Sequence, residues 1–270
     1  MSQEIRYISV NGANLGYEVH SEGSGKPAAI FVHGYSGRST GGESYPELID
    51  TLAKEFTVYA LDARGHGASA AEFENFSIGA VADDAVAFAK QLGLVKLVFI
   101  GHSFGGYIGL YGEVRHPGTF GAIALLAPAD AGSGEHKANM EFAQVMIAHG
   151  RNPEFMGQLL PAMYTRKPEL AGRQAAALAL IDPRVHELYF AEFSNLSFID
   201  KLENVTTPVL FINGCKDVVI PPSAQHETAI ALPNCKEVNF TAEGHMFPVE
   251  CGEVVANEIA YFYKSFVQIA

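Results

Sequence analysis

Residues 96–110, KLVFIGHSFGGYIGL, contain the pattern that decides the fold. A short apolar run, typical of a buried strand, leads into Gly101–Gly105 (GHSFG), and an apolar segment with helical character follows. A strand that turns sharply into a helix at G-x-S-x-G is the backbone context of a serine nucleophile, here Ser103. Because so short a pattern also arises by chance, its meaning depends on the rest of the chain.

Strand and helix signals alternate on both sides of this segment. Asn11-Gly12 between two alternating runs predicts a β-hairpin, whereas the later apolar runs are typical of strands covered on both faces. Ser77 is the predicted N-cap of a helix that Gly93 ends. The alternation predicts an α/β fold with a mostly parallel sheet and helices on both faces. The predicted strands after the hairpin lie at 28–34, 57–62, 96–101, 121–130, 208–214 and 236–241, and predicted helices at 44–56, 78–92, 104–115 and 252–267.

The alternation stops between about residues 131 and 207. Helix-like segments follow one another there without a strand signal, at 135–150, 153–164, 167–181 and 184–195. An insertion between two core strands is expected to form a helical cap or lid. The predicted domains are therefore a core at 1–130 and 208–270 and a cap at 131–207.

Length and composition fit one large α/β domain with an insertion. The 270 residues are 48% hydrophobic and 18% charged, which suits a sizeable core. A formal net charge of −12 disfavours nucleic-acid binding, since an acidic surface repels phosphates.

The three cysteines, Cys215, Cys235 and Cys251, are too few for a disulfide framework and indicate a reducing compartment. Without a signal-peptide pattern or an apolar run long enough to span a membrane, we expect a soluble cytoplasmic protein.

A serine nucleophile needs a base, and the base needs an acid that orients it. If both follow Ser103 in the chain, His245 in TAEGHMFPVE is the favoured base because it lies in a loop after a predicted strand. His226 is the alternative, although it falls inside a helix-like segment. Asp217 is the favoured acid because it stands just beyond a buried strand, at the sheet edge where catalytic groups gather. Asp130, at the end of the preceding strand, is the alternative acid.

An oxyanion that forms during attack would be held by backbone N–H groups. One is expected from Phe104, which follows the nucleophile, and the other from Tyr35 in the loop HGYSG after a predicted strand. His33 is interpreted as a structural residue that ties down this loop. His102 is expected to pack inward beneath the turn rather than to act as the base.

Five motifs together resemble the α/β-hydrolase fold family, in the family's order and over nearly the whole chain. The resemblance implies an eight-stranded sheet, a helical cap after strand six and a triad of Ser103, Asp217 and His245, with Tyr35 and Phe104 as oxyanion donors. The motifs are VHGYSG at 32–37, DARGHGAS at 62–69, GHSFGG at 101–106, GCKDVVIP at 214–221 and GHMFP at 244–248.

The resemblance also indicates which residues are not expected to be catalytic. It implies that Asp62, Arg64 and His66 belong to a structural loop. Haloalkane dehalogenases and epoxide hydrolases of this fold use an aspartate where this chain has Ser103, so these relatives are excluded.

Four of the six methionines lie in the predicted cap, namely Met140, Met146, Met156 and Met163. Methionine fills irregular apolar surfaces, so two interpretations stay open: these residues fix the cap to the core, or they line an apolar pocket over the nucleophile. In the second case Met140, Met146 and Met163 are candidate substrate-binding residues. Arg38, in the polar loop GYSGRSTGGES, is either a solvated surface residue or the partner of a substrate carboxylate.

The leading hypothesis is a cofactor-free hydrolase that cleaves a small or medium carboxylic ester or lactone through an acyl-enzyme. Fold and triad also serve amide and C–C bond hydrolysis, so a hydrolase of a carboxylated substrate is an alternative. A small-molecule sensor with little turnover is a further alternative. In each case the expected partner is a small molecule, not a nucleic acid or a membrane, and no metal is expected.

Overall fold

A computed structural model describes residues 3–42, 44–69, 76–128, 132, 137–193 and 195–267, without the side chains of 137–140 and 142. Within these residues, eight strands form one sheet in the order β1-β2-β4-β3-β5-β6-β7-β8. The predicted eight-stranded α/β architecture is confirmed. The strands are β1 (Arg6–Val10), β2 (Ala13–His20), β3 (Ala28–Val32), β4 (Thr57–Leu61), β5 (Val98–His102), β6 (Ala122–Leu126), β7 (Val209–Gly214) and β8 (Cys235–Phe240).

The sheet is antiparallel only at its N-terminal edge. The predicted hairpin joins β1 to β2, with positive φ angles of 47° at Asn11 and 79° at Gly12, as a two-residue type I′ turn requires. β2 pairs antiparallel with β4, and every later pairing is parallel. The carboxyl ends of β3, β5, β6, β7 and β8 therefore meet at one edge.

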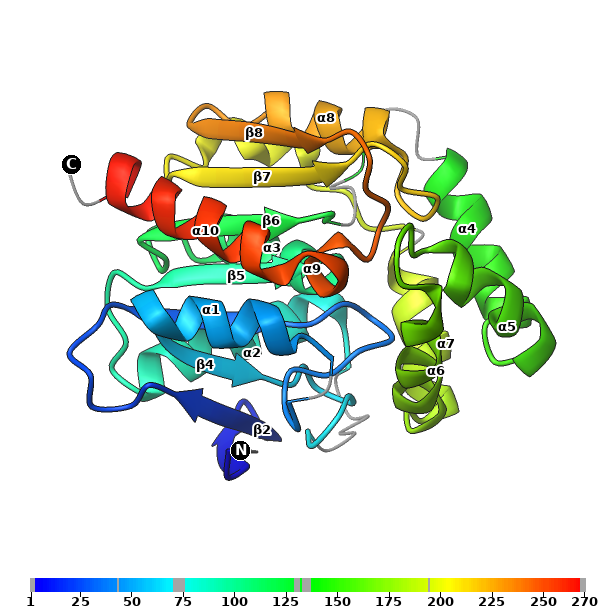
Figure 1. Cartoon of the computed structure of the whole chain (residues 1–270), viewed down its shortest axis with the longest axis horizontal. Helices are drawn as coiled ribbons and strands as arrows, with labels where there is room; N and C mark the ends of the chain where they lie inside the picture. The colour runs from blue at the N-terminus through cyan, green and yellow to red at the C-terminus, as the bar shows by residue number, and fades with distance from the viewer. Residues whose placement is uncertain are drawn as a thin grey trace.

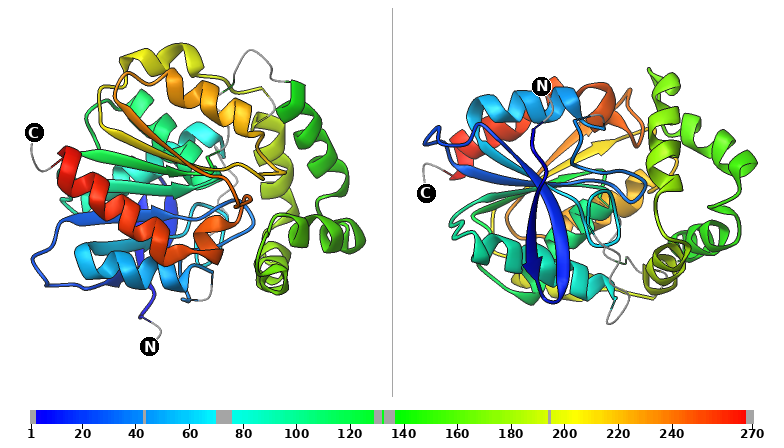
Figure 2. Two further views of the ribbon diagram at one scale, coloured as in Figure 1. Left: turned by 45° about the horizontal axis from the view of Figure 1, so that its top comes forward. Right: turned by 90° about the horizontal axis from the view of Figure 1, so that it is seen from below.

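Helices cover both faces of the sheet, as Figures 1 and 2 show. On one face α1 (Pro46–Glu55) and α10 (Gly252–Phe262) pack together, and the short α9 (Phe247–Glu250), which precedes α10, contacts both helices. On the other face lie α2 (Ile78–Gln91), α3 (Phe104–Arg115) and α8 (Pro222–Ile230). Burial on both faces explains the near-continuous apolar runs of the central strands. A π-helical turn, η3 (Tyr263–Val267), follows α10.

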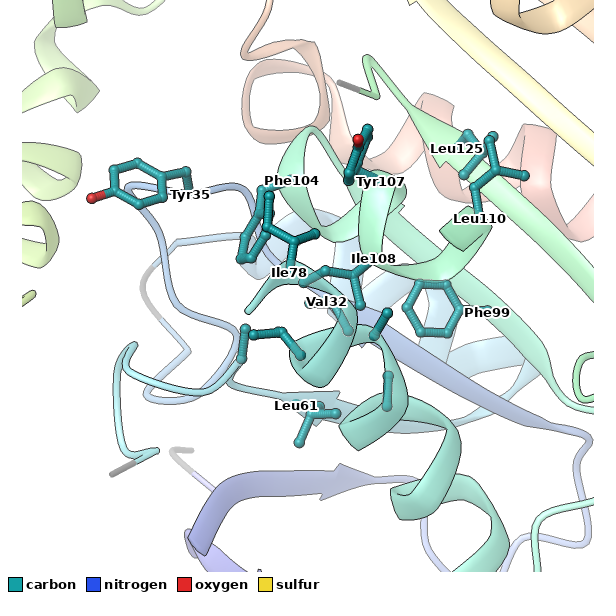
Figure 3. Close-up of a cluster of buried hydrophobic side chains, with 14 of the residues drawn as sticks. Val32, Tyr35, Leu61, Ile78, Phe99, Phe104, Tyr107, Ile108, Leu110 and Leu125 are labelled. Atoms are coloured by element: carbon teal, nitrogen blue, oxygen red, sulfur yellow. The ribbon is translucent and has the colours of Figure 1, made fainter. Parts of the chain in front are cut away.

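The predicted boundaries of α2 are confirmed. The Ser77 hydroxyl accepts the N–H of Ala80 at 2.9 Å, and Gly93 has a φ of 66° just beyond the helix. α3 packs against β5 so closely that a Cβ on Gly109 would lie 2.2 Å from the Phe99 ring. Figure 3 shows the apolar cluster that α2 and α3 form over the sheet.

In the described residues, the insertion between β6 and β7 consists of helices joined by turns and short irregular segments, without a strand. Its helices lie on the side toward which the parallel strands point (Figure 1), next to the carboxyl edge of the sheet. The division into two separate domains stays a prediction. The elements are α4 (Lys137–His149), α5 (Pro153–Ala162), η1 (Pro168–Leu170), α6 (Ala171–Ala179), α7 (Pro183–Phe193) and η2 (Ile199–Asn204). Among all described residues, no helix is both long and apolar enough to cross a membrane.

Candidate active site

Ser103 stands at the sharp turn between β5 and α3, as predicted. Its backbone has φ 50° and ψ −115°, a conformation that costs a non-glycine residue about 1–3 kcal/mol. The surrounding hydrogen bonds hold this geometry: Ser103 donates its N–H to Leu126 at 2.8 Å, and its carbonyl accepts the N–H of Tyr107 at 3.1 Å. This strained turn lies at the carboxyl edge of the sheet, so the Ser103 side chain points toward the space beyond the strands.

Two glycines allow the turn to close. A Cβ on Gly101 would lie 2.3 Å from the carbonyl carbon of Gly105, and a Cβ on Gly105 would lie 2.2 Å from the carbonyl oxygen of Val32. Real Cβ atoms do not approach backbone atoms so closely, so β5, α3 and β3 meet here only because side chains are absent.

We therefore expect Gly105→Ala to lower the free energy of unfolding by at least about 2–3 kcal/mol, because the Val32 carbonyl cannot move without breaking the sheet. Thermal unfolding should show a decrease in Tm of about 5–10 °C. Gly157→Ala is the matched control, since Gly157 is exposed within α5 and a Cβ there meets no atom within 4 Å. The control should be neutral or slightly stabilising. Equal stability of the two variants would contradict the close-approach argument.

His245 and Asp217 form a buried pair at the same edge. His245 Nδ1 lies 2.7 Å from Asp217 Oδ2, and the two residues are 2% and 8% exposed. The carboxylate is itself fixed, since Oδ1 accepts the N–H groups of Val219 and Ile220 at 2.7 and 2.9 Å, and Oδ2 accepts Gln225 Nε2 at 3.0 Å. With Nδ1–H donated to Asp217, His245 keeps Nε2 as the acceptor that a general base needs.

The structure also places the alternatives to this pair. His226 lies on α8 with its side chain 57% exposed, and its Nδ1 pairs with Glu237 at 2.8 Å. It is therefore on the surface, away from Ser103. Asp130 lies outside the described residues.

The predicted oxyanion donors flank the turn. Phe104 is the first residue of α3, so its N–H has no acceptor within the helix and lies at the positive end of the helix dipole. Tyr35 lies in the loop after β3, and its ring forms the edge of the apolar cluster on the side of the inserted helices (Figure 3). There its hydroxyl pairs with His186 Nδ1 at 2.7 Å, and its ring stacks on Tyr189 at 4.5 Å. That both N–H groups point at one oxyanion stays a prediction.

The other histidines near the turn are structural, as predicted. His33 is fully buried, with Nδ1 at 2.7 Å from the Gly34 carbonyl oxygen and Nε2 accepting the N–H of Ala63 at 3.1 Å. Burial lowers the pKa of His33 to about 4. His102 packs beneath the turn and pairs with Tyr45 and the backbone of the His245 loop.

The 62–69 motif forms a buried loop. Asp62 accepts the N–H groups of Ser39-Thr40 at 2.6 and 3.0 Å, and Arg64 pairs with Asp84 at 2.8 Å. Burial lowers the pKa of His66 to about 3, so it is neutral at physiological pH. These contacts agree with a structural role for Asp62, Arg64 and His66.

A cavity opens over Ser103 and His245. Its empty space, counted with the open mouth, is about 890 Å³. The lining is mainly apolar, with side chains from the inserted helices forming the far wall. The principal apolar residues are Met146, Met156, Leu159, Leu160, Met163, Leu170, Tyr189, Phe190, Phe193, Val219, Ile220, Met246 and Val249.

Two of the three predicted substrate-binding methionines, Met146 and Met163, lie in this lining. The side chain of Met140 lies outside the described residues. Arg38 is not among the residues that line this cavity, and its pairing with a substrate carboxylate stays a prediction. Its guanidinium folds back over its own loop, where a Cβ on Gly41 would lie 2.7 Å from Arg38 Nη2.

Sequence reasoning missed a polar part of the wall. Gln174, buried on α6, donates Nε2–H to Ser36 Oγ and accepts the Tyr164 hydroxyl proton at 3.3 Å. Arg173 lies beside it in the lining. A signal existed: Gln174 falls between the buried residues Ala171 and Leu178 at helical spacing, so a polar side chain lies on the inward face of α6.

Hydrogen bonds connect the segment after α5 to the loop and the short helix that follow His245. The buried Glu250 carboxylate accepts the successive N–H groups of residues 165–167 at 2.5–3.1 Å. Met246 donates its N–H to the Met163 carbonyl at 3.1 Å. Charge-assisted hydrogen bonds of this kind are strong. They fix this wall of the cavity relative to His245.

Similar proteins are hydrolases at low sequence identity. A family model described as "Alpha/beta hydrolase family" matches residues 29–258. The putative carbamate hydrolase RutD of Rhizobium rhizogenes is 27% identical, covering 92% of this chain and 97% of its own. The bifunctional esterase/perhydrolase DCH of Acinetobacter calcoaceticus is 24% identical, covering 88% and 92%. The crystal structure of the enol-lactonase from Burkholderia xenovorans LB400 superposes with a TM-score of 0.83 at 21% identity, covering 96% and 100%.

Proposed function

Because the chain belongs to the α/β-hydrolase family, we propose that it is a cofactor-free serine hydrolase that cleaves a carboxylic ester or lactone through an acyl-enzyme. One observation carries the proposal. His245, with Nδ1 committed to Asp217, faces the same cavity as Ser103 on its strained turn. A nucleophile, a base and an orienting acid are the groups that acyl transfer requires.

In the acylation half-reaction, Ser103 Oγ attacks the ester carbonyl carbon and passes its proton to His245 Nε2. Asp217 stabilises the resulting imidazolium through the 2.7 Å hydrogen bond to Nδ1. The negative charge on the former carbonyl oxygen is held by the N–H groups of Tyr35 and Phe104. As the tetrahedral intermediate collapses, the C–O bond to the alcohol breaks, and the alkoxide takes the proton from His245.

In the deacylation half-reaction, water attacks the acyl-Ser103 carbonyl while His245 Nε2 accepts a water proton. The same N–H groups hold the second oxyanion. Collapse returns the proton to Ser103 Oγ and releases the carboxylic acid. For a lactone, the alcohol and the acid are the two ends of one product.

The lining favours a mainly uncharged acyl group. Apolar side chains dominate the cavity, and the polar Gln174–Ser36 pair is confined to one wall next to the Tyr35 loop. An esterase and an enol-lactonase are among the similar proteins, which supports an ester or lactone as the bond that is cleaved. Burial of apolar acyl surface would supply most of the binding energy, at about 25 cal/mol per Å².

A turnover screen tests the proposal. We expect a neutral short- or medium-chain ester, or a lactone, to be hydrolysed at about 1 s⁻¹ or faster, within the usual enzyme range. The screen should include esters of increasing acyl length, lactones, amides and esters with a carboxylate on the acyl chain, each with Ser103→Ala as the control. Preferred cleavage of amides, or no turnover of any ester or lactone, would contradict the choice of bond.

The second candidate is amide or C–C bond hydrolysis of a carboxylated substrate. The position of Arg173 in the cavity lining favours it, because a guanidinium recognises a carboxylate well. In the same screen, this candidate requires that carboxylated substrates be preferred and that Arg173→Gln remove the preference. Equal rates for carboxylated and neutral esters would exclude it.

A further inference from the structure

Three hydrogen bonds join the segments that carry the proposed catalytic groups. The N–H of Gly34 donates to the Tyr45 hydroxyl oxygen at 3.1 Å, and that hydroxyl lies 2.8 Å from His102 Nδ1. His102 Nε2 lies 3.0 Å from the carbonyl oxygen of His245. The chain therefore begins one residue before Tyr35, passes through the residue before Ser103, and ends on the backbone of His245.

Only one arrangement of protons satisfies every link. A carbonyl oxygen only accepts, so His102 must carry its proton on Nε2 and donate it to His245. Nδ1 is then an acceptor, so Tyr45 must donate its hydroxyl proton to it. The Tyr45 oxygen remains free to accept the N–H of Gly34. Complete burial holds the pKa of His102 well below its usual value, which keeps this neutral form in place.

Packing holds both rings in position. Tyr45 is 3% exposed and His102 is 1% exposed. The Tyr45 ring meets Phe31 of β3 edge-on at 4.8 Å and His102 at 5.7 Å. A Cβ on Gly34 would lie 3.0 Å from His102 Nδ1, so the loop, the tyrosine and the histidine are in close contact.

We propose that Tyr45 and His102 are positioning residues, which hold the Tyr35 loop and the His245 loop at fixed distances from Ser103. The inference rests on the proposed function, because it assigns the oxyanion and base roles to those loops. Neither residue touches the reacting atoms in the mechanism above. Their effect should appear in the transition state, when the oxyanion and the imidazolium both form, and only weakly in substrate binding.

Tyr45→Phe is the direct test, since it removes one oxygen and keeps the ring. We expect kcat for the best ester to fall about 10- to 100-fold while KM changes by less than about threefold, because small displacements of catalytic groups lower the rate of the chemical step. Affinity for a transition-state analogue, such as an alkyl boronic acid, should fall by the same factor as kcat/KM. Tyr107→Phe is the matched control, since it removes a tyrosine hydroxyl that donates to the Leu196 carbonyl at 3.1 Å. The control should keep kcat within about twofold.

A second pair of variants separates positioning from stability. His102→Gln keeps one acceptor and one donor, whereas His102→Leu keeps neither, so we expect the glutamine variant to retain at least about tenfold more kcat at similar Tm. The proposal is overturned if Tyr45→Phe keeps kcat within twofold, or if Tyr45→Phe, His102→Gln and His102→Leu lose activity only in proportion to their loss of Tm. A wild-type protein that neither hydrolyses esters nor reacts with a fluorophosphonate overturns the proposed function itself. A reactive wild type with unimpaired Tyr45→Phe overturns only the positioning roles.

Discussion

Replacement of Ser103 by alanine is expected to lower kcat for the best ester by about 10⁵- to 10⁶-fold, the largest effect of any substitution in the chain. The variant keeps the cavity, the predicted oxyanion donors and the Asp217–His245 pair, but it has no atom that forms the acyl-enzyme. Residual hydrolysis would come from a water molecule that His245 activates in place of Ser103. Steady-state kinetics of purified protein measures the effect.

Substrate binding by this variant should be nearly unchanged, because the apolar lining supplies most of the contacts. Ser223→Ala, an exposed serine on α8, is the matched control and should retain full activity. Retention of more than about 1% of wild-type kcat in Ser103→Ala would show that a different group is the nucleophile.

The second largest effect is expected from Asp217→Asn, with kcat lowered about 10⁴-fold, as in other serine hydrolase triads. The asparagine oxygen still accepts the N–H groups of Val219 and Ile220 at the position of Oδ1. Its NH₂ group then faces His245 Nδ1 as a donor, so the proton of the imidazole moves to Nε2. In that tautomer His245 has no free lone pair toward Ser103 and cannot act as the base.

Gln225 adds an expected loss of stability to the effect of Asp217→Asn. Its Nε2 donates to Asp217 Oδ2 at 3.0 Å, so the asparagine NH₂ meets a second donor and the fold is destabilised modestly, by about 1–2 kcal/mol. Asp200→Asn, at an exposed aspartate in η2, is the control for the charge change and should leave kcat unchanged. If Asp217→Asn keeps kcat within tenfold of wild type, the pairing with His245 is structural rather than catalytic.

Much of the core fold could be predicted from local patterns. Parallel strands that are buried on both faces consist of continuous apolar runs, which can be recognised in the sequence without knowing which strands pair. Ser77 and Gly93 mark the ends of α2 because a serine side chain caps a helix start and a glycine adopts the positive φ that follows a helix end. The turn at Ser103 was predictable for the same reason, because Gly101 and Gly105 are local requirements of a close approach. His245 and Asp217 were predictable from chain order, since each follows a strand that ends at one edge.

The remainder of the site depends on contacts between distant segments. Arg38 lies in the same loop as Tyr35, but its guanidinium lies against Gly41 and not in the cavity, which no pattern in the sequence records. Tyr45 immediately precedes α1 and belongs to no motif, yet folding brings its hydroxyl between residues 34 and 102. The helical spacing of Gln174 with Ala171 and Leu178 indicates the inward face of α6, but its partners Ser36 and Tyr164 follow only from the fold.

The most direct test of the account is covalent labelling by a fluorophosphonate, followed by mass spectrometry of the labelled peptide. An activated serine reacts with this reagent, whereas an ordinary hydroxyl does not. We expect one label on the folded protein, carried by the peptide that contains Ser103, and none on denatured protein or on Ser103→Ala. A folded wild-type protein that stays unlabelled, or a label on any other serine, would contradict the assignment of Ser103 as the nucleophile.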